Sequence, residues 1–334
     1  MIQLEYMNGI GGDFFIFWEI GRAVLAGLGP YTVDLSCYPP TTSLIFTLFG
    51  LLPYYPAYIF WTALNTTLYM AALRKMKLGR TWWIWLLYTP FLFNLLTGQL
   101  DVVFFWLATH LSQSAKEPLK SRGLQPSEDK KKPIHFKLSS VWHAYWQPAL
   151  AGALLTLKPQ LAAVILPWYL LRWLSVERGI LALWTGLTVV LHTLSLAYDL
   201  NIYSQWIGAL NGVSEMKANV SAGIFAFQLI DIPIPVLAVI GLVTAVWGLT
   251  RREELSRPAQ LIAFPLTIWY DGIILAGSGP GLWLVPLSWV AFLASGMVKN
   301  CLPLTVIPLA ALATLIISPI SVNKDQRGER VLQE

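Results

Sequence analysis

The sequence predicts an all-α membrane protein, a polytopic helical bundle of about ten transmembrane helices. Hydrophobic residues make up 56% of the 334 residues, charged residues make up only 12%, and long apolar segments recur along the chain. A soluble domain has about 25% charged residues. Because backbone polar groups in lipid must be satisfied within the protein, the spans are expected to be helices.

The apolar segments follow one another in order, and several are separated by short polar corners. They are expected at residues 56–73, 82–96, 100–111, 144–157, 161–174, 180–197, 234–249, 258–268, 273–297 and 302–320. The sequence leaves open whether residues 273–297 are one span or are broken at 277–281, Gly-Ser-Gly-Pro-Gly. We assign residues 1–322 to the membrane domain and residues 323–334 to a polar C-terminal tail.

Several of these segments have only 11–15 residues, whereas a span needs about 20. Such helices can stop at a polar site sunk into the membrane, because irregular backbone is tolerated where it lines protein or water. The corners between the short helices are therefore the places to look for functional residues.

Positive charge is distributed unevenly among the connections. Residues 74–80, 113–141, 172–178 and 251–257 carry 4, 7, 2 and 3 Lys or Arg, which is 16 of the 23 in the chain. Basic connections mark the cytoplasmic side, and residues 113–141 are predicted to be a flexible cytoplasmic loop. The opening segment, residues 1–55 with short helices, then faces outward together with the alternate corners. We expect a multi-pass protein of the plasma (inner) membrane.

The same charge distribution argues against nucleic acid as a partner, because the basic residues stand beside hydrophobic spans. Membrane lipids are the expected surroundings. Cys37 and Cys301 have no metal or redox spacing, and the four histidines, among them His110 and His192, are scattered. We expect no cofactor, although a divalent metal is not excluded. The absence of an Asp-x-Asp motif argues against a soluble-type site for a nucleotide sugar.

Asp13 lies in the segment Gly-Gly-Asp-Phe-Phe, ahead of the first apolar span. Its carboxylate can act as a general base at the membrane surface. The alternative is an acidic residue that caps a helix or lies in a solvated loop. Residue spacing alone favours the second interpretation.

Lys158 interrupts a long apolar run, and Pro159 ends the helix before it. A charged residue at membrane depth is costly and indicates function by default. Its ammonium suits a phosphate group as a point charge, whereas the alternative is that it reaches toward the lipid headgroups. Gln99 and Asp101 lie in the equivalent corner of the preceding helical pair. These two side chains can hydrogen-bond a sugar or a lysine, or can cap a helix.

A third outward corner contains Asp271 directly after Trp269 and Tyr270. Aromatic rings beside a carboxylate suit sugar binding. Trp and Tyr are, however, also common at both membrane–water interfaces, which is the simpler explanation for most of the 16 Trp in the chain.

The succession of these segments resembles glycosyltransferase family 87, also known as the DUF2029 family. The resemblance lies in GGDFFIFWEIGRAVLAGLGPY, YPPTTSLIFTLFGLLP, LLTGQLDVVFFWLATHL, PALAGALLTLKPQLAAVILPWYLLRW and FPLTIWYD, in this order, over residues 10–275. It implies a GT-C-type membrane enzyme whose active site faces the extracytoplasmic side. The chain is similar to bacterial polyprenyl-phosphate-mannose-dependent α-mannosyltransferases.

The resemblance also implies roles for particular residues. Asp13 corresponds to the aspartate of the first outer loop, which is thought to be the catalytic base. The Tyr-Pro-Pro triplet begins at Tyr38, the Gly-Gln corner contains Gln99, and the Lys-Pro corner contains Lys158. Family members usually carry a transmembrane helix before that loop. Only twelve residues precede Asp13 here, so we expect the usual first helix to be missing.

The predicted activity is transfer of a hexose, mannose, from a polyprenyl-phosphate-linked donor to a lipid or glycan acceptor, with inversion as the resemblance implies. Asp13 would be the base and Lys158 would offset the phosphate charge. Gln99 and Asp271 would orient sugar hydroxyls, with Tyr38 and Trp269 as further substrate-binding residues. The alternatives are a non-enzymatic transporter or flippase of lipid-linked sugars, or a structural subunit of a membrane complex.

Overall fold

The fold of the protein is given by a computed structural model that describes residues 10–116, 145–214, 232–264, 269–276, 281–298 and 302–317. These residues contain fourteen α-helices and five 3-10 helices, and no strand occurs among them. The all-α prediction is therefore confirmed. The expected loop at residues 113–141 lies almost entirely outside the described residues, as does the tail at residues 323–334.

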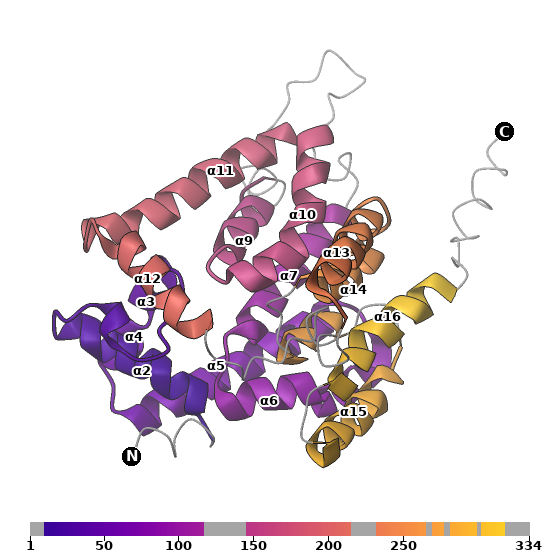
Figure 1. Ribbon diagram of the computed structural model, residues 1–334, viewed down its shortest axis with the longest axis horizontal. Helices are drawn as coiled ribbons and strands as arrows, with labels where there is room; N and C mark the ends of the chain where they lie inside the picture. Colours follow the sequence, from indigo (N-terminus) through magenta and orange to yellow (C-terminus); the bar gives the residue numbers. More distant parts are fainter. Residues whose placement is uncertain are drawn as a thin grey trace, which may run out of the picture.

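The N-terminal region consists of short helices, as predicted, followed by one long helix. These elements are α2 (Gly12–Leu25), η1 (Pro30–Thr32), α3 (Pro40–Ile45), α4 (Thr47–Gly50) and α5 (Tyr54–Lys75). Each of α3 and α5 follows a proline at its N-cap position, where the extended backbone that proline favours leads into the first helical turn. Figure 1 shows α2 to α4 at one flank of the molecule, beside α12.

The remaining elements alternate between short helices and 3-10 turns. They are η2 (Gly79–Leu87), α6 (Thr89–Thr97), α7 (Asp101–Lys116), α9 (Gln147–Leu155), α10 (Pro159–Ser175), α11 (Arg178–Thr193), η4 (Leu194–Ala197), α12 (Ile202–Ser214), α13 (Ile234–Leu249), α14 (Glu253–Ala263), η6 (Trp269–Leu275), α15 (Leu284–Val298), η7 (Leu302–Thr305) and α16 (Val306–Ile317). The helical pairs on either side of residues 97–101 and of residues 156–159 agree with the predicted corners.

Two expected segments differ from the structure, and the alternative left open for residues 273–297 is resolved in favour of the broken segment. The helix expected at residues 82–96 is divided into η2 and α6, because Pro90 occupies the first turn of α6 and cannot continue a preceding helix. The segment at residues 273–297 is not one span, since η6 ends at Leu275 and α15 begins at Leu284. The helix expected at 258–268 begins earlier, at Glu253, where acidic residues in the first turn favour a helix start.

The number of membrane spans is smaller than predicted when each helix is judged by length and hydropathy. In the described part of the chain, only the helical stretch Arg178–Ala197 is long and apolar enough to cross a membrane by itself. The pair Pro40–Gly50 and Tyr54–Lys75, which bends by 119°, would be a second span. Three shorter apolar helices begin at Pro235, Leu284 and Pro303. The ten-span bundle therefore stays a prediction.

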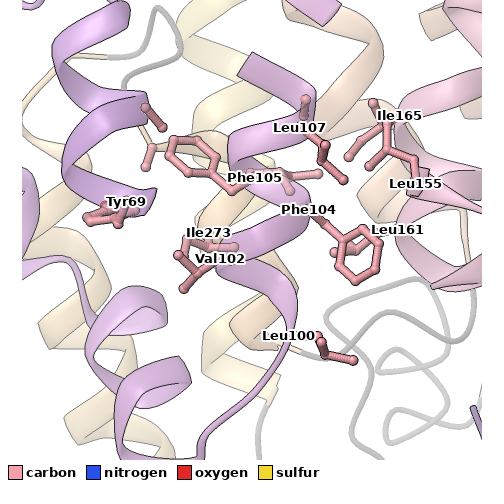
Figure 2. Close-up of a cluster of buried hydrophobic side chains, with 14 of the residues drawn as sticks. Tyr69, Leu100, Val102, Phe104, Phe105, Leu107, Leu155, Leu161, Ile165 and Ile273 are labelled. Atoms are coloured by element: carbon pink, nitrogen blue, oxygen red, sulfur yellow. The ribbon is translucent and has the colours of Figure 1, made fainter. Parts of the chain in front are cut away.

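Helix α7 lies at the centre of the hydrophobic core. Figure 2 shows Phe105 of α7 near Tyr69 of α5, and Phe104 on the side of α7 that faces Leu161 of α10. Tyr69 stacks on Phe91 of α6 with ring centroids 3.8 Å apart. Because burial of such large side chains is the main favourable term in packing, these contacts fix α7 against its neighbours. The polar residues at its two ends are thereby fixed as well.

Helices α7 and α10 run in the same direction, and their two ends carry different polar groups. At one end, Asp101 of α7 bonds Lys158, the N-cap residue of α10. At the other end, Ser112 of α7 and Tyr169 of α10 both bond Glu253 of α14. We call these the Lys158 end and the Glu253 end of the bundle.

Candidate functional site

Lys158 lies between two buried carboxylates from distant parts of the chain. Its ammonium forms ion pairs with Asp101 Oδ1 and with Asp271 Oδ1, the latter at 3.1 Å. The side chains of Lys158, Asp101 and Asp271 are only 5%, 0% and 1% exposed. Ions removed from water in this way persist only when they are paired. We call these three residues the Lys158 cluster.

Local structure explains how each member reaches the cluster. Lys158 is the non-helical residue before α10, and Pro159 occupies the first helical position, where a missing N–H does no harm. Asp101 begins α7, where the helix dipole favours an acidic side chain. Asp271 belongs to η6, and the adjacent Gly272 carbonyl accepts a 2.9 Å hydrogen bond from Tyr88. The two helix starts and η6 therefore converge on one ammonium group.

Asp13 lies in the first turn of α2, which is pressed against the end of α6. The N–H of Gly11 donates to the carbonyl of Leu96 across 2.6 Å. Gly98 has φ 79°, and a Cβ there would stand 2.4 Å from Cβ of Phe14. Only glycine allows both this backbone conformation and this close approach. The tight packing brings the Asp13 carboxylate to the side chains of Thr97 and Gln99.

The pKa of Asp13 is raised above its ordinary value, and burial is the main cause. Hydrogen bonds from Gln99 and Thr97 act in the opposite direction, as does the positive charge of Lys158. A carboxylate with a raised pKa is a stronger base once it has lost its proton. Asp13 therefore has the electrostatics expected of a base, and it lies within the field of the Lys158 cluster.

Tyr38 connects to Asp13 through Gln99. The Tyr38 hydroxyl donates to Gln99 Oε1 across 3.1 Å, so the amide nitrogen of Gln99 is the atom left to donate to Asp13. Gln99 is buried. Tyr38 is itself positioned by an edge-to-face contact with Phe17 of α2, with ring centroids 4.9 Å apart. The chain Tyr38–Gln99–Asp13 fixes the orientation of the carboxylate.

The segment that carries Tyr38 is also held against the Lys158 corner. Thr42 donates a 2.6 Å hydrogen bond to the carbonyl of Leu157, the residue before Lys158. The structure thus brings together five of the six residues singled out in the sequence: Asp13, Tyr38, Gln99, Lys158 and Asp271. The sixth, Trp269, begins η6, but its side chain lies outside the described part of the structure.

The environment of Lys158 differs from the one expected from the sequence. Lys158 was predicted to point outward toward a phosphate and Asp271 toward a sugar, but the two side chains contact each other. For Asp101, contact with a lysine was one of the two hydrogen-bonding options that the sequence allowed, and this contact is present. Within the described residues, no group of three or more His, Cys, Asp and Glu is placed to hold a metal ion.

A second buried ionic cluster, at the Glu253 end, was missed in the sequence. Glu253 Oε1 accepts hydrogen bonds from Arg257 at 2.6 Å and from Tyr169 at 2.5 Å, and Oε2 accepts one from Ser112 at 3.2 Å. We call these four residues the Glu253 cluster. Residues 251–257 were expected to be a basic connection, which is wrong for Glu253 and Arg257, since both are buried in α14. Their i,i+4 spacing was the available signal.

The fold and the site together define an all-helical protein with a buried, acid-rich site where several helix starts meet. Comparison with protein families matches residues 37–276 to glycosyltransferase family 87, and the chain belongs to this family. The family assigns it to the glycosyltransferases, enzymes that require a sugar donor and an acceptor. Comparisons with curated proteins and with solved structures gave no match.

The matched region contains the Lys158 cluster, Tyr38 and Gln99, but it begins after Asp13. The assignment of Asp13 to the site therefore depends on its contacts with Gln99 and Thr97 and on the proximity of Lys158, and not on the family match.

Proposed function

We propose that this glycosyltransferase moves a hexose, mannose, from a polyprenyl-phosphate-linked donor to a lipid or glycan acceptor on the extracytoplasmic face of the plasma membrane. The observation that carries the proposal is the position of Asp13: a carboxylate with a raised pKa, held by Gln99 and within the field of Lys158. This combination places a base and a cation in one site, which is what transfer from a sugar phosphate requires.

The positions of the basic connections support the proposed side of the membrane. Lys75, at the end of α5, bonds His110 near the end of α7. Trp168 of α10 donates to the carbonyl of Arg251. Both contacts lie at the Glu253 end, so the basic connection at residues 74–80 and Arg251, which precedes α14, share that end. Since basic connections stay in the cytoplasm, the Lys158 end is proposed to face outward, where lipid-linked donors are available.

In the proposed reaction, an acceptor hydroxyl oxygen attacks the anomeric carbon of the donor sugar. Asp13 accepts the proton of that hydroxyl, the bond from the anomeric carbon to the phosphate oxygen breaks, and its electron pair leaves with the polyprenyl phosphate. Attack from the side opposite the leaving group inverts the anomeric configuration. General-base assistance of this kind is worth about 10²–10⁴-fold in rate.

Lys158 is proposed to offset the charge that develops on the departing phosphate. Asp101 and Asp271 hold its ammonium in place. They also weaken the field of its charge, so its effect is largest on groups that touch it. Gln99, Asp271, Tyr38 and Trp269 are proposed to orient the sugar, and no cofactor is part of the proposal.

The test is transfer of radiolabelled mannose from polyprenyl-phosphate-mannose in membranes that contain the protein. Asp13→Asn keeps the shape of the side chain but cannot accept the proton, so we expect the rate of transfer to fall by about 100-fold or more. Asp34→Asn is the matched control, because Asp34 is an exposed aspartate in the same N-terminal region, and it should transfer at the wild-type rate.

Unchanged transfer by Asp13→Asn would remove Asp13 from the catalytic role. If wild-type protein gave no labelled product but moved labelled donor across the membrane of sealed vesicles, the transporter alternative would replace the enzyme.

A further inference from the structure

A second group of polar side chains lies beside the candidate site, and it contains no carboxylate, lysine or arginine. His192, in the last turn of α11, makes a 2.8 Å hydrogen bond through Nε2 with Thr156 Oγ1. Its backbone carbonyl accepts hydrogen bonds from Ser195 at 2.7 Å and from Tyr203 of α12 at 2.6 Å. We call Thr156, His192, Ser195 and Tyr203 the His192 cluster.

The His192 cluster adjoins the candidate site through the segment that carries Tyr38. Thr156 precedes Lys158 by two residues. Thr41 donates a 3.0 Å hydrogen bond to the carbonyl of Leu191, next to His192. Trp206 of α12 donates one of 3.0 Å to the carbonyl of Cys37, next to Tyr38. Residues 37–42 therefore contact the helices that carry His192 and Tyr203, and also contact Gln99 and the Lys158 corner.

The hydrogen bonds that Thr156 and Tyr203 make with His192 determine which ring nitrogen can bind a ligand. The Thr156 hydroxyl donates to the carbonyl of Ala153 across 2.6 Å, so its oxygen accepts from His192 Nε2. In the neutral imidazole, Nδ1 then carries the lone pair. The Tyr203 hydroxyl oxygen lies 3.4 Å from Nδ1, a distance too long for a strong hydrogen bond. Nδ1 is thus available to accept a hydrogen bond from a ligand hydroxyl.

The composition of the cluster fits a neutral sugar better than a phosphate. It offers imidazole and hydroxyl acceptors at half-buried positions, at Thr156, His192 and Tyr203. Tyr203 also makes an edge-to-face contact with Trp206, with ring centroids 6.3 Å apart, which adds apolar surface for the C–H face of a sugar ring. A site for an anion would place a cation or backbone N–H groups at this point.

We infer that the His192 cluster is a hexose-binding subsite and that it holds a sugar residue of the acceptor. The assignment of this sugar to the acceptor rests on the proposed function, whereas the inference that the cluster binds a hexose rests on the cluster alone. A glycan or glycolipid acceptor is longer than one sugar, so it can be anchored at His192 and still present a hydroxyl to Asp13. The donor sugar, in contrast, must lie between Lys158 and Asp13, because its phosphate is the leaving group.

The experiment measures binding of methyl α-mannopyranoside to the purified full-length protein in detergent by saturation-transfer-difference NMR. We expect saturable binding by the wild type. Loss of one or two hydrogen bonds should weaken binding by about five-fold or more in His192→Ala and by about three-fold in Tyr203→Phe. His110→Ala is the matched control, since His110 is a half-buried histidine that bonds Lys75 at the Glu253 end, and it should bind as the wild type does.

Circular dichroism and gel filtration check that each variant is folded, and Tyr203→Phe tests the cluster even if His192→Ala does not fold. No binding by the wild type, or equal binding by wild type, His192→Ala and Tyr203→Phe, would overturn the subsite. Competition by polyprenyl-phosphate-mannose separates the two sources of a sugar. If the donor leaves the glycoside bound, the acceptor assignment is supported; if the donor displaces it, that assignment is wrong.

The result of the sugar-binding experiment is independent of the result of the mannose-transfer assay. Binding that depends on His192, together with transfer that does not depend on Asp13, would keep the subsite and reject the proposed mechanism. Transfer that depends on Asp13, together with binding that ignores His192, would do the reverse.

Discussion

The two ends of helices α7 and α10 carry ionic clusters that differ in their ratio of acidic to basic side chains. Asp101 and Ser112 on α7, and Lys158 and Tyr169 on α10, are eleven residues apart, or about 16 Å at the rise of an α-helix. At the Glu253 end, one carboxylate meets one guanidinium, and both carboxylate oxygens accept hydrogen bonds. At the Lys158 end, one ammonium serves two buried carboxylates.

This difference distinguishes a closed structural contact from the candidate functional site. The Glu253 cluster has a net charge of zero and ties α7, α10 and α14 together. The Lys158 cluster brings two acidic side chains to one cation, and Asp101 Oδ2 is buried without a hydrogen-bond partner among the described residues. Asp13 brings a further carboxylate into the same field. Clustered acidic groups of this kind are typical of functional sites, which is why the Lys158 end is the candidate.

The largest effect in this comparison is expected when Lys158 is removed. Lys158→Met leaves two buried carboxylates without their shared cation, so we expect the free energy of unfolding to fall by about 3–5 kcal/mol. Arg178→Met is the control: Arg178 is exposed, and its Nε donates to the carbonyl of Leu174 at 3.3 Å. Its loss should change stability by less than about 1 kcal/mol. Thermal unfolding of both variants in the same detergent measures the difference, and equal melting temperatures would contradict it.

Rescue experiments should distinguish the two clusters more sharply. We expect Arg257→Met to destabilise by about 3 kcal/mol, because it leaves the buried Glu253 carboxylate uncompensated. Adding Glu253→Gln should recover most of this loss, since no charge is left over and the new amide can still bond Tyr169 and Ser112.

The corresponding rescue at the other end should be incomplete. Asp101→Asn added to Lys158→Met still leaves the Asp271 carboxylate buried without its cation, so we expect recovery of about half of the loss. The measurement is a double-mutant cycle on unfolding free energy at each end. Full recovery at the Lys158 end would mean that Asp271 does not need Lys158 as a partner once Asp101 is neutral.

Much of the framework of this site could be predicted from the sequence, because it depends on local patterns. The Lys-Pro corner marked the start of α10, and the cost of a charge at membrane depth marked Lys158 as important. Its second carboxylate partner could not be predicted, since Asp271 lies 113 residues away. Asp13 meets Gln99 only because Gly98 permits the close approach of α2.

The Glu253 cluster and the His192 cluster were not predicted from the sequence, and the reason can be given for each. Counting Lys and Arg in residues 251–257 treated Arg257 as a solvated loop residue, although Glu253 four positions earlier neutralises it in a buried helix. His192 has no metal spacing and no local motif, and its partner Thr156 is 36 residues away. Both clusters join helices that only the folded chain brings together.

The smallest expected effect concerns the pH dependence of transfer, which tests how the Lys158 end tunes Asp13. A general base acts in its deprotonated form, so the donor kcat/KM should rise with pH as Asp13 loses its proton. Because burial raises the pKa of Asp13, the midpoint of this rise should lie above the ordinary aspartate value of about 3.9. Asp34→Asn should give the wild-type profile.

Gln99 and Tyr38 should move that midpoint in a defined direction and order. Gln99→Leu removes a hydrogen bond that favours the charged carboxylate, so the midpoint of the rise in kcat/KM should move to higher pH. Tyr38→Phe removes only the bond that orients Gln99, so its upward shift of the midpoint should be smaller than that of Gln99→Leu. A downward shift in either variant would mean that these side chains favour the protonated carboxyl, and Asp13 would then be suited to donate a proton and not to accept one.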